Sequence, residues 1–454
     1  MSSANRFTLP DPPTSKKSAR VTLWPLVAAT FFMVSGGTYG TEDVVRGAGY
    51  GGAILILLIT PLLWSLPTAY MIGELASALP EEGGYYAWVR RAMGNCWGFQ
   101  EAWLSLLASV FDMAIYPTLF VLYLARLFPW FGVGHRGVLV GVAVVAVCAA
   151  MNIAGIKVVA TTSVWLFFLL SAPFAVIVVL APFHVGSLAH VAGSPTVSQV
   201  SLIGGLLVAM WNYMGWDNAS TIAAEVEKPQ RTYPRAMIAT VVLVSASYIL
   251  PVGAMALTRL TPTAWDTGSW ADIANMLGGP WLRVWLVLGG MMSAFGMFNA
   301  LVMSYSRLPY AMAIDGLLPK VFARVMQRSQ APWVSILVLA TGWALCLGLG
   351  FERLVTLDIL IYGGSLLLEF IALVVLRFTE PELPRPFRVP GGTFGAVLVG
   401  VLPMALLAFS IVRSDHEQIL GMNSFVFGVL MIAAGFAVYA ILECGLRITP
   451  RRVK

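Results

Sequence analysis

Charge is scarce in this chain. Only 11% of its 454 residues are Asp, Glu, Lys or Arg, whereas 58% are hydrophobic. Soluble globular domains carry about 25% charged residues, because their surfaces face water. The deficit excludes a soluble globular protein and places most of the sequence where a charge is costly.

Cysteine and histidine are rarer still, with four of each. The cysteines form no CxxC pair, so neither a disulfide framework nor a zinc site is indicated. The HExxH, GxSxG and Walker-type patterns that carry hydrolase or nucleotide chemistry are absent too. We therefore predict no metal, no cofactor and no enzymatic activity.

Long apolar runs make up most of the chain. A helix needs about 20 mostly apolar residues to cross a bilayer. Twelve segments meet this requirement: 23–46, 52–78, 98–127, 137–154, 159–181, 201–224, 236–258, 282–306, 333–350, 355–377, 395–412 and 422–444. The predicted fold class is an all-α integral membrane protein with twelve transmembrane helices.

The basic residues are distributed unevenly between the two sides of this arrangement. If the N-terminus is cytoplasmic, 21 of the 28 lysines and arginines fall on the inner side and seven on the outer side. Basic residues accumulate on the cytoplasmic side of membrane proteins. We therefore expect cytoplasmic tails at 1–22 and 445–454, and we assign the net charge of +6 to topology, not to nucleic-acid binding.

Two of the predicted spans are interrupted by polar residues and glycine. The first breaks at Ser35, Gly36 and Gly37, and the sixth breaks between Asn212 and Asn218. The breaks near Gly36 and Met214 lie 178 residues apart, which fits a duplication of five spans, 23–181 and 201–377, followed by two extra helices at 395–444. Paired interruptions in two halves are typical of a transporter site at the bilayer midplane. Alternatively, the glycines only allow close helix packing.

Acidic residues enter the spans without basic partners. Asp112 and Asp217 lie well inside, and others lie nearer the ends: Glu42, Asp43, Glu74, Glu101, Asp358 and Glu369. Ionisable groups within the membrane face a cavity or a partner, because their burial in lipid is costly. A set of one sign requires protons, metal cations or a cationic substrate, and a bound cation is the prediction.

Asp217 is the first candidate, because Tyr213 and Trp216 beside it would form a cradle for an ammonium group together with its carboxylate. It could instead cap the second half of the broken helix. Asp112, with Tyr116 one turn later, is the second candidate, although a protonated, hydrogen-bonded carboxyl with Tyr116 in plain packing is equally compatible.

Glu42 and Asp43 occupy the outer half of the first span. They could form an exposed pair with Arg46, or a negative vestibule that concentrates cations. The half-helix that begins after Gly37 points bare N–H groups into the membrane, where they would suit the carboxylate of an amino acid. A polyamine has no carboxylate and would leave these donors to water.

The chain resembles the amino acid–polyamine–organocation (APC) superfamily, and within it the polyamine-uptake branch and the L-type amino acid transporters. The residues that carry the resemblance are Ser35-Gly36-Gly37, Thr41-Glu42-Asp43, Gly73-Glu74-Leu75, Pro80-Glu81-Glu82-Gly83-Gly84-Tyr85, Trp97-Gly98-Phe99-Gln100-Glu101, Met113 to Pro117, Trp211-Asn212-Tyr213, Trp216 to Ser220 and Glu225-Val226-Glu227-Lys228-Pro229.

The resemblance implies a 5+5 inverted repeat of the LeuT-like type, with helices 1 and 6 unwound around the substrate. Carried over to this chain, it places Ser35, Gly36, Gly37, Trp211, Tyr213 and Asp217 at the site, and Glu74 and Glu225 in cytoplasmic gating contacts. Several members place a lysine in span five, where this chain has Leu170 and Ser171. That difference shifts the expected coupling role to the acidic residues.

Residues and resemblance together predict a multi-pass plasma-membrane (inner-membrane) carrier that takes up polyamines or amino acids by alternating access, coupled to protons. The predicted site comprises Ser35, Gly36, Gly37, Asp112, Tyr116, Trp211, Tyr213, Trp216 and Asp217, with Glu42, Asp43, Glu74 and Glu225 in vestibule, coupling or gating roles. The alternatives are a neutral amino acid permease or exchanger and, outside transport, a membrane solute sensor of the same fold.

Overall fold

The computed structural model describes residues 21–446, except 82, 133, 156–160, 192–201, 414–417 and 420–421. Within the described helices and strands, side chains are not described at 161–167, 222–225, 411, 413, 418–419, 423–425 and 444–446. The predicted tails, 1–22 and 445–454, therefore lie almost entirely outside the described residues.

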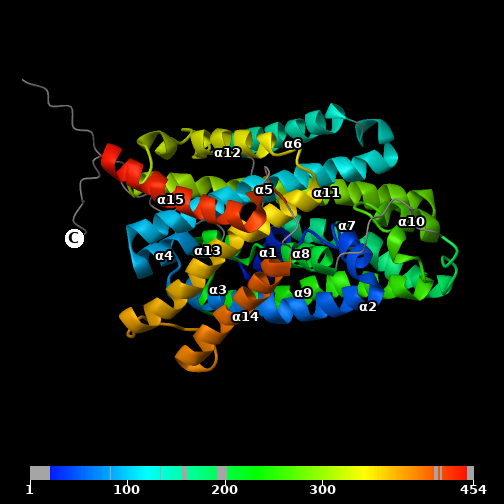
Figure 1. Ribbon diagram of the computed structural model, residues 1–454, viewed down its shortest axis with the longest axis horizontal. Coiled ribbons are helices and arrows are strands. Elements are labelled where there is room, and N and C mark those ends of the chain that lie inside the picture. Colours follow the sequence, from blue (N-terminus) through cyan, green and yellow to red (C-terminus); the bar gives the residue numbers. More distant parts are fainter. Residues whose placement is uncertain are drawn as a thin grey trace, which may run out of the picture.

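The described chain is almost entirely helical (Figure 1). The α-helices are α1 (Leu23–Val34), α2 (Glu42–Thr60), α3 (Leu66–Ala78), α4 (Tyr85–Met93), α5 (Asn95–Leu127), α6 (His135–Ala154), α7 (Thr161–Leu180), α8 (Leu202–Asn212), α9 (Pro229–Thr258), α10 (Trp270–Gly278), α11 (Pro280–Ile314), α12 (Trp333–Leu345), α13 (Phe351–Thr379), α14 (Gly392–Arg413) and α15 (Ser424–Leu446). A π-helix, η1 (Pro61–Ser65), joins α2 to α3, and short 3₁₀ helices occupy η2 (Pro129–Gly132), η3 (Ala181–His184), η4 (Trp216–Glu225), η5 (Pro262–Ala264) and η6 (Lys320–Ala323). Two strands, β1 (Gln418–Ile419) and β2 (Met422–Asn423), pair antiparallel.

Eight helical segments among the described residues are long and apolar enough to cross a membrane, and three shorter ones are also apolar. This supports a multi-pass membrane protein, while the count of twelve spans stays a prediction. The continuous segment Glu42–Ala78 contains a kink at Gly49, whose φ is +65°. The kink separates a short helix, 42–48, from the longer one that follows, which agrees with the predicted boundary between the first two spans.

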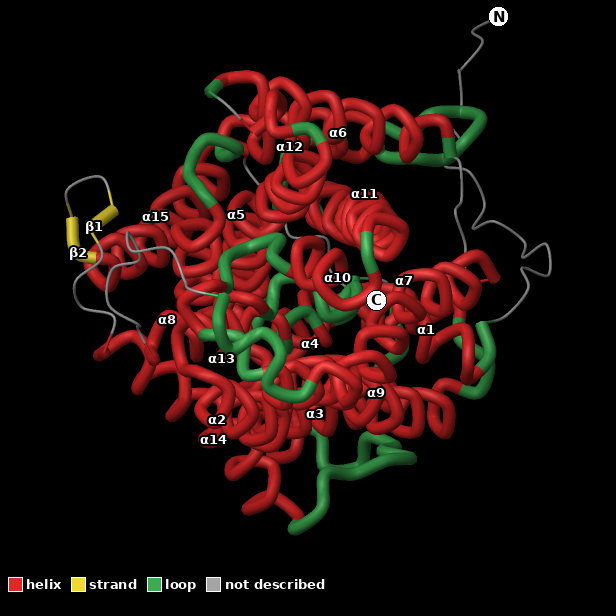
Figure 2. The backbone as a smooth tube through the Cα atoms, turned by 90° about the vertical axis from the view of Figure 1, so that its right-hand side faces the viewer, coloured by secondary structure: helices red, strands yellow, loops and turns green. Residues whose placement is uncertain are grey.

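The long helices run side by side along the longest axis of the molecule (Figure 1), and Figure 2 shows the same bundle from one end. Two short helices, α4 and α10, lie at opposite ends. Helix α5 crosses the middle of the bundle and packs along both α11 and α13. Helix α13 also contacts α8, which leads into the second interruption. Polar side chains of α5, α11 and α13 therefore lie inside the bundle near this interruption.

Both interruptions predicted from the sequence are present, and they touch each other. Helix α1 ends at Val34 and α2 begins at Glu42, while α8 ends at Asn212 and η4 begins at Trp216. The Asn212 Nδ2 donates to the Gly40 carbonyl at 3.2 Å. At Gly215 φ is +85°, and a Cβ there would lie 2.8 Å from the Met33 carbonyl oxygen. Only glycine therefore fits where the two unwound segments meet.

Candidate substrate site

The Asp112 carboxyl, on α5, accepts hydrogen bonds from three aromatic side chains on three helices. Tyr116 donates to Oδ1 at 3.0 Å, the Trp211 indole N–H donates to Oδ1 at 3.3 Å, and the Tyr305 hydroxyl donates to Oδ2 at 3.4 Å. Asp112 is only 6% exposed. The predicted residues Asp112, Tyr116 and Trp211 are thus brought together, and Tyr305, from α11, completes the group.

Asp217 is buried at the start of η4, directly after the second interruption. Its Oδ1 accepts a hydrogen bond from the Tyr362 hydroxyl on α13 at 2.6 Å. The backbone N–H groups of Asp217 and Asn218 also interact with its carboxylate. These contacts beside the break are of the kind that the capping alternative requires, and the role of Asp217 as a ligand stays a prediction.

A third carboxyl belongs to the same group. Asp358, on α13, is 1% exposed, and its Oδ2 has no hydrogen-bond partner among the described residues. It lies close enough to Asp112 and Asp217 to be repelled by both. None of the three forms an ion pair with a described lysine, arginine or histidine side chain. We name Asp112, Asp217 and Asp358 the central carboxyls.

Sequence reasoning gave too little weight to Asp358 and missed Tyr305 and Tyr362 as partners of the carboxyls. The missing signal is helical spacing: Asp358, Tyr362, Ser365 and Glu369 follow one another at i, i+4, i+7 and i+11, which places them on one face of α13. Such a polar stripe in an apolar helix marks the side that faces other helices.

Two predicted aromatic residues bind backbone, not the Asp217 carboxyl. The Trp216 indole N–H donates to the Tyr213 carbonyl at 2.7 Å, and the Tyr213 hydroxyl donates to the Leu57 carbonyl at 2.9 Å. The first bond lies within the interruption, whereas the second joins the interruption to α2. The Asp217 carboxyl has Tyr362 as its aromatic hydrogen-bond donor, and the predicted cradle of Tyr213 and Trp216 for an ammonium group stays a prediction.

The first interruption is held by its own side chains and by α11. The Gly37 N–H donates to Ser35 Oγ at 3.1 Å, and Ser293 Oγ donates to the Gly36 carbonyl. At Gly36 φ is +62°, and a Cβ there would lie 2.1 Å from Met297 Sδ. A side chain at position 36 would therefore require both a disfavoured backbone conformation and movement of the Met297 and Ser293 side chains.

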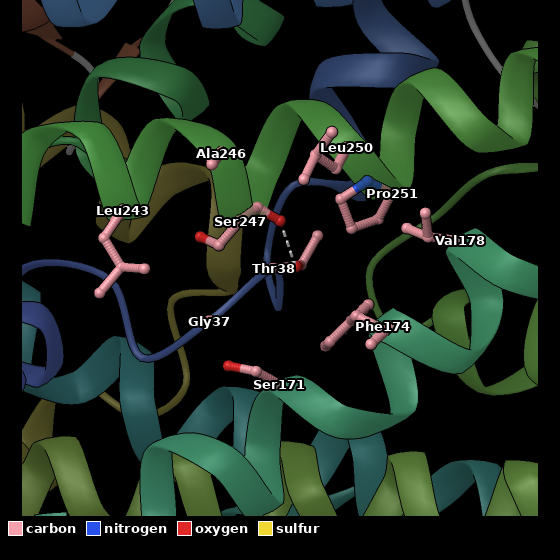
Figure 3. A pocket seen from close by; sticks show the side chains of 11 residues that line it. Gly37, Thr38, Ser171, Phe174, Val178, Leu243, Ala246, Ser247, Leu250 and Pro251 are labelled. Carbon is pink, nitrogen blue, oxygen red and sulfur yellow. Dashed lines mark hydrogen bonds between the residues drawn. The ribbon is translucent and has the colours of Figure 1, made fainter. Parts of the chain in front are cut away.

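A pocket of about 210 Å³ adjoins this interruption (Figure 3). Ser171 and Phe174 on α7 face Ser247 on α9 across it, and the Thr38 hydroxyl donates to the Ser247 carbonyl at 2.7 Å. Its lining is mostly apolar and contains none of the central carboxyls. Ser171, which is near the place where the resemblance puts a lysine in several family members, is thus beside the α1 break.

Glu42 and Asp43 are buried, so the alternative of an exposed pair is wrong. Glu42 Oε1 accepts from the Tyr123 hydroxyl at 2.5 Å and from the Gly268 N–H at 3.0 Å. Asp43 accepts from Thr267 Oγ1 at 2.7 Å, and it lies 3.8 Å from the Arg46 guanidinium. The chain before α10 covers both carboxyls, which sequence spacing could not show.

Glu74, on α3, has the opposite environment to the central carboxyls. Arg377 donates to it through Nε at 3.0 Å and through a terminal nitrogen at 2.5 Å, and the Val389 N–H donates at 2.7 Å. A nitrogen of Arg385 lies 3.5 Å away. The arrangement ties α3 to the end of α13 and to the following loop. The side chain of Glu225, the other predicted gating residue, lies outside the described side chains.

Comparison with known proteins identifies the family of this chain. The amino acid permease family matches residues 27–441. A polyamine transporter of Arabidopsis thaliana is 36% identical over 409 residues, which cover 88% of this chain and 83% of that protein. A polyamine transporter of rice is 36% identical over 400 residues (87% and 74%), and a serine/threonine exchanger of Bacillus subtilis is 25% identical over 406 residues (86% and 89%). The matches extend over nearly the whole chain, so it belongs to the amino acid permease family of the APC superfamily.

Proposed function

We propose that the protein is a secondary active carrier that imports polyamines by alternating access and couples their movement to protons. The observation that carries the proposal is the group of central carboxyls, Asp112, Asp217 and Asp358, which no described basic side chain neutralises. A membrane protein tolerates such a group where it faces a bound cation. Tyr116, Tyr305 and Trp211 beside it supply aromatic faces of the kind that hold ammonium groups.

The first interruption favours a cation over the carboxylate of an amino acid. Helix α2 carries Glu42 and Asp43 in its first turn, so the positive end of its dipole is already matched by acidic side chains. The Gly37 N–H is taken by Ser35 Oγ. An amino acid carboxylate at this helix end would therefore meet negative charge, whereas the amines of a polyamine would be attracted.

The comparisons point in the same direction. The most similar relatives described above are polyamine transporters of plants, at 36% identity, whereas the serine/threonine exchanger is 25% identical. Transport of a neutral amino acid is accordingly the second candidate, and a sensor of the same fold that binds without transport is the third.

The proposal includes a plasma-membrane location with both termini in the cytoplasm, twelve spans and the 5+5 inverted repeat. The uneven distribution of basic residues supports this orientation. The end that carries α4 would then face the cytoplasm, with Arg91 paired to Glu81 and Glu380 (Figure 1). The end that carries α10 would face outward, with Arg126 paired to Asp266 and Asp272.

Uptake into proteoliposomes tests the proposal. Purified protein is reconstituted, and uptake of labelled putrescine, spermidine, arginine and leucine is measured at two transmembrane pH differences. We expect accumulation of putrescine or spermidine that changes with the pH difference. Preferential uptake of leucine would favour the amino acid permease, and saturable polyamine binding without uptake would favour the sensor.

A variant pair links the activity to the site. Asp217→Asn keeps the shape of the side chain but removes its charge, so we expect it to lose most of its polyamine uptake. Asp266→Asn is the matched control, because Asp266 is exposed at the end of the bundle and Arg126 retains Asp272 as a partner. Wild-type kinetics in Asp217→Asn would remove Asp217 from the site.

A further inference from the structure

A second pair of carboxyls lies in the same helix interface as the central carboxyls. Glu101, on α5, and Glu369, on α13, are each 0% exposed. Neither oxygen of Glu369 has a hydrogen-bond partner among the described residues, and the same holds for Oε2 of Glu101. The two carboxyls are near enough to repel each other. They form no ion pair with a described basic side chain.

The spacing of these residues relates the pair to the central carboxyls. Glu101 precedes Asp112 by 11 residues, and Glu369 follows Asp358 by 11 residues. Eleven residues make about three helical turns, so each helix presents both carboxyls on one face, roughly 16 Å apart along its axis. Because α5 and α13 pack together, the two faces form a single acidic seam inside the bundle.

Hydroxyl groups bridge the two helices beside the pair. Ser365 Oγ donates to Glu101 Oε1 at 2.6 Å, and the hydroxyls of Ser105 and Ser365 are 2.8 Å apart. These bonds occupy one oxygen of Glu101 and leave its other oxygen and all of Glu369 free to hold a proton. A proton shared between the two carboxyls would satisfy two of these three unpaired buried oxygens and remove one negative charge.

Among the described residues, the groups that face Glu369 from the neighbouring elements include no cation. They are Tyr85 on α4, Glu101 on α5, Asp217 on η4 and Tyr362 on α13. The nearest arginine along α13, Arg377, is already bound to Glu74. Two ionised carboxylates in such a place are prohibitively costly. A bound proton removes the repulsion between the two carboxylates and needs no additional space. An ammonium group would need space beside side chains that have no exposed surface.

We propose that Glu101 and Glu369 together bind one proton, and that this proton is released when the ammonium group of a substrate binds at the central carboxyls. The inference rests on the proposed function. Asp217 interacts electrostatically with both carboxyls of the pair. Neutralisation of Asp217 by an ammonium group therefore lowers the repulsion within the seam and allows the pair to ionise. By linkage, protonation of the pair weakens substrate binding by the same factor.

Proton release on binding is the direct measurement. Spermidine is added to purified protein in weakly buffered detergent solution that contains a pH indicator dye, and binding is followed in parallel by calorimetry. We expect the wild type to release up to one proton per bound substrate near neutral pH, and Glu369→Gln to bind spermidine with no release. Glu382→Gln is the matched control, because Glu382 is exposed on the loop after α13.

A conservative variant shows whether Glu369→Gln loses proton release because its structure is damaged or because the titratable carboxyl is gone. Glu369→Asp retains a titratable carboxyl and should restore proton release, with its midpoint at a different pH. In proteoliposomes with the membrane potential clamped at zero, a gradient of one pH unit should change wild-type accumulation by about tenfold for one proton exchanged per substrate. Glu369→Gln should show no response to the gradient while retaining substrate exchange.

Three outcomes would overturn the inference. Undiminished proton release in Glu369→Gln would assign the proton elsewhere. If Glu369→Gln bound butylamine normally but spermidine poorly, the pair would be the site of a second ammonium group instead. If the wild type takes up polyamine but releases no proton, the proton-binding proposal is wrong and the proposed function still holds. If it neither binds nor takes up polyamine, the proposed function is wrong as well.

Discussion

Two buried carboxylates illustrate how differently this molecule treats the same chemical group. Glu74 and Asp217 are both almost fully buried, at 0% and 3% exposure. Glu74 is surrounded by Arg377, Arg385 and a backbone N–H, so all of its charge is matched within the protein. Asp217 receives neutral donors only, chiefly Tyr362.

The presence or absence of a basic partner distinguishes acids with a structural role from acids with a proposed functional role. An acid whose partners are supplied by the chain holds elements together, here α3 with the end of α13. An acid that has no basic partner inside a membrane protein is a candidate site for a proton or a cationic substrate, which binds and is then released. The four predictions below test this distinction.

The largest effect is expected at Glu74. Glu74→Ala would leave Arg377 and Arg385 without their buried partner, which costs about 3–5 kcal/mol when a buried ion pair is broken. Thermal unfolding of the purified protein should show a strongly lowered midpoint. Glu81→Ala is the control, since its single ion pair with Arg91 is exposed and such pairs contribute about 0–1 kcal/mol. Equal unfolding midpoints for the two variants would show that the basic partners of Glu74 do not stabilise the fold.

Asp217→Asn should have the converse behaviour. Its unfolding midpoint should be unchanged or higher, because the substitution removes repulsion from Asp358 and Glu101. A hydrogen bond to a charged group contributes about 1.5–3 kcal/mol. Polyamine kcat/KM should therefore fall about tenfold to a hundredfold. A marked loss of stability with unchanged transport would identify Asp217 as a structural residue.

A smaller effect is expected at the meeting point of the two interruptions. Gly215→Ala places a Cβ against the Met33 carbonyl at a positive φ, and the backbone conformation alone costs about 1–2 kcal/mol. Gly253→Ala is the matched control, because a Cβ at that position of α9 meets no atom within 4 Å. Transport should fall in the first variant only. If both variants behave alike, close contact of the interruptions is not required.

The smallest effect is expected at the exposed end. Arg91→Ala removes ion pairs to Glu81 and Glu380, which together contribute about 1 kcal/mol or less at the surface. Hydrogen bonding to Arg91 lowers the pKa of Glu380. The stability supplied by this pair is present above the pKa of the unfolded state and is lost as pH falls through the folded pKa. Unfolding midpoints of wild type and variant should therefore converge in acid.

Much of the fold was predictable, because the length and hydropathy of an apolar segment identify a membrane helix in the sequence. The predicted spans 98–127 and 137–154 correspond to α5 and α6, and 333–350 begins at the first residue of α12. Both interruptions were visible as glycine and polar residues inside apolar runs. The short helices α4 and α10 were not predicted, because nine residues are too few to cross a membrane.

The site was predicted in part. Asp112, Tyr116 and Trp211 do converge, and the role of Asp217 as a ligand stays a prediction. The partners from α11 and α13 were missed, since a tyrosine in an apolar helix is most often packing, and nothing local distinguishes Tyr305 or Tyr362. Burial of Glu42 and Asp43 depends on residues 267 and 268, which are more than 200 positions away.

By itself the sequence determined that this chain lies in a membrane, where its long apolar segments run, where two of them break and that acids lie inside apolar segments. These properties are local, because each depends on the composition of one segment. Only the tertiary structure decided which acids are matched and which are not. Arginines at 377 and 385 neutralise Glu74 across 300 residues of chain, whereas the faces of α5 and α13 bring the unmatched carboxyls together.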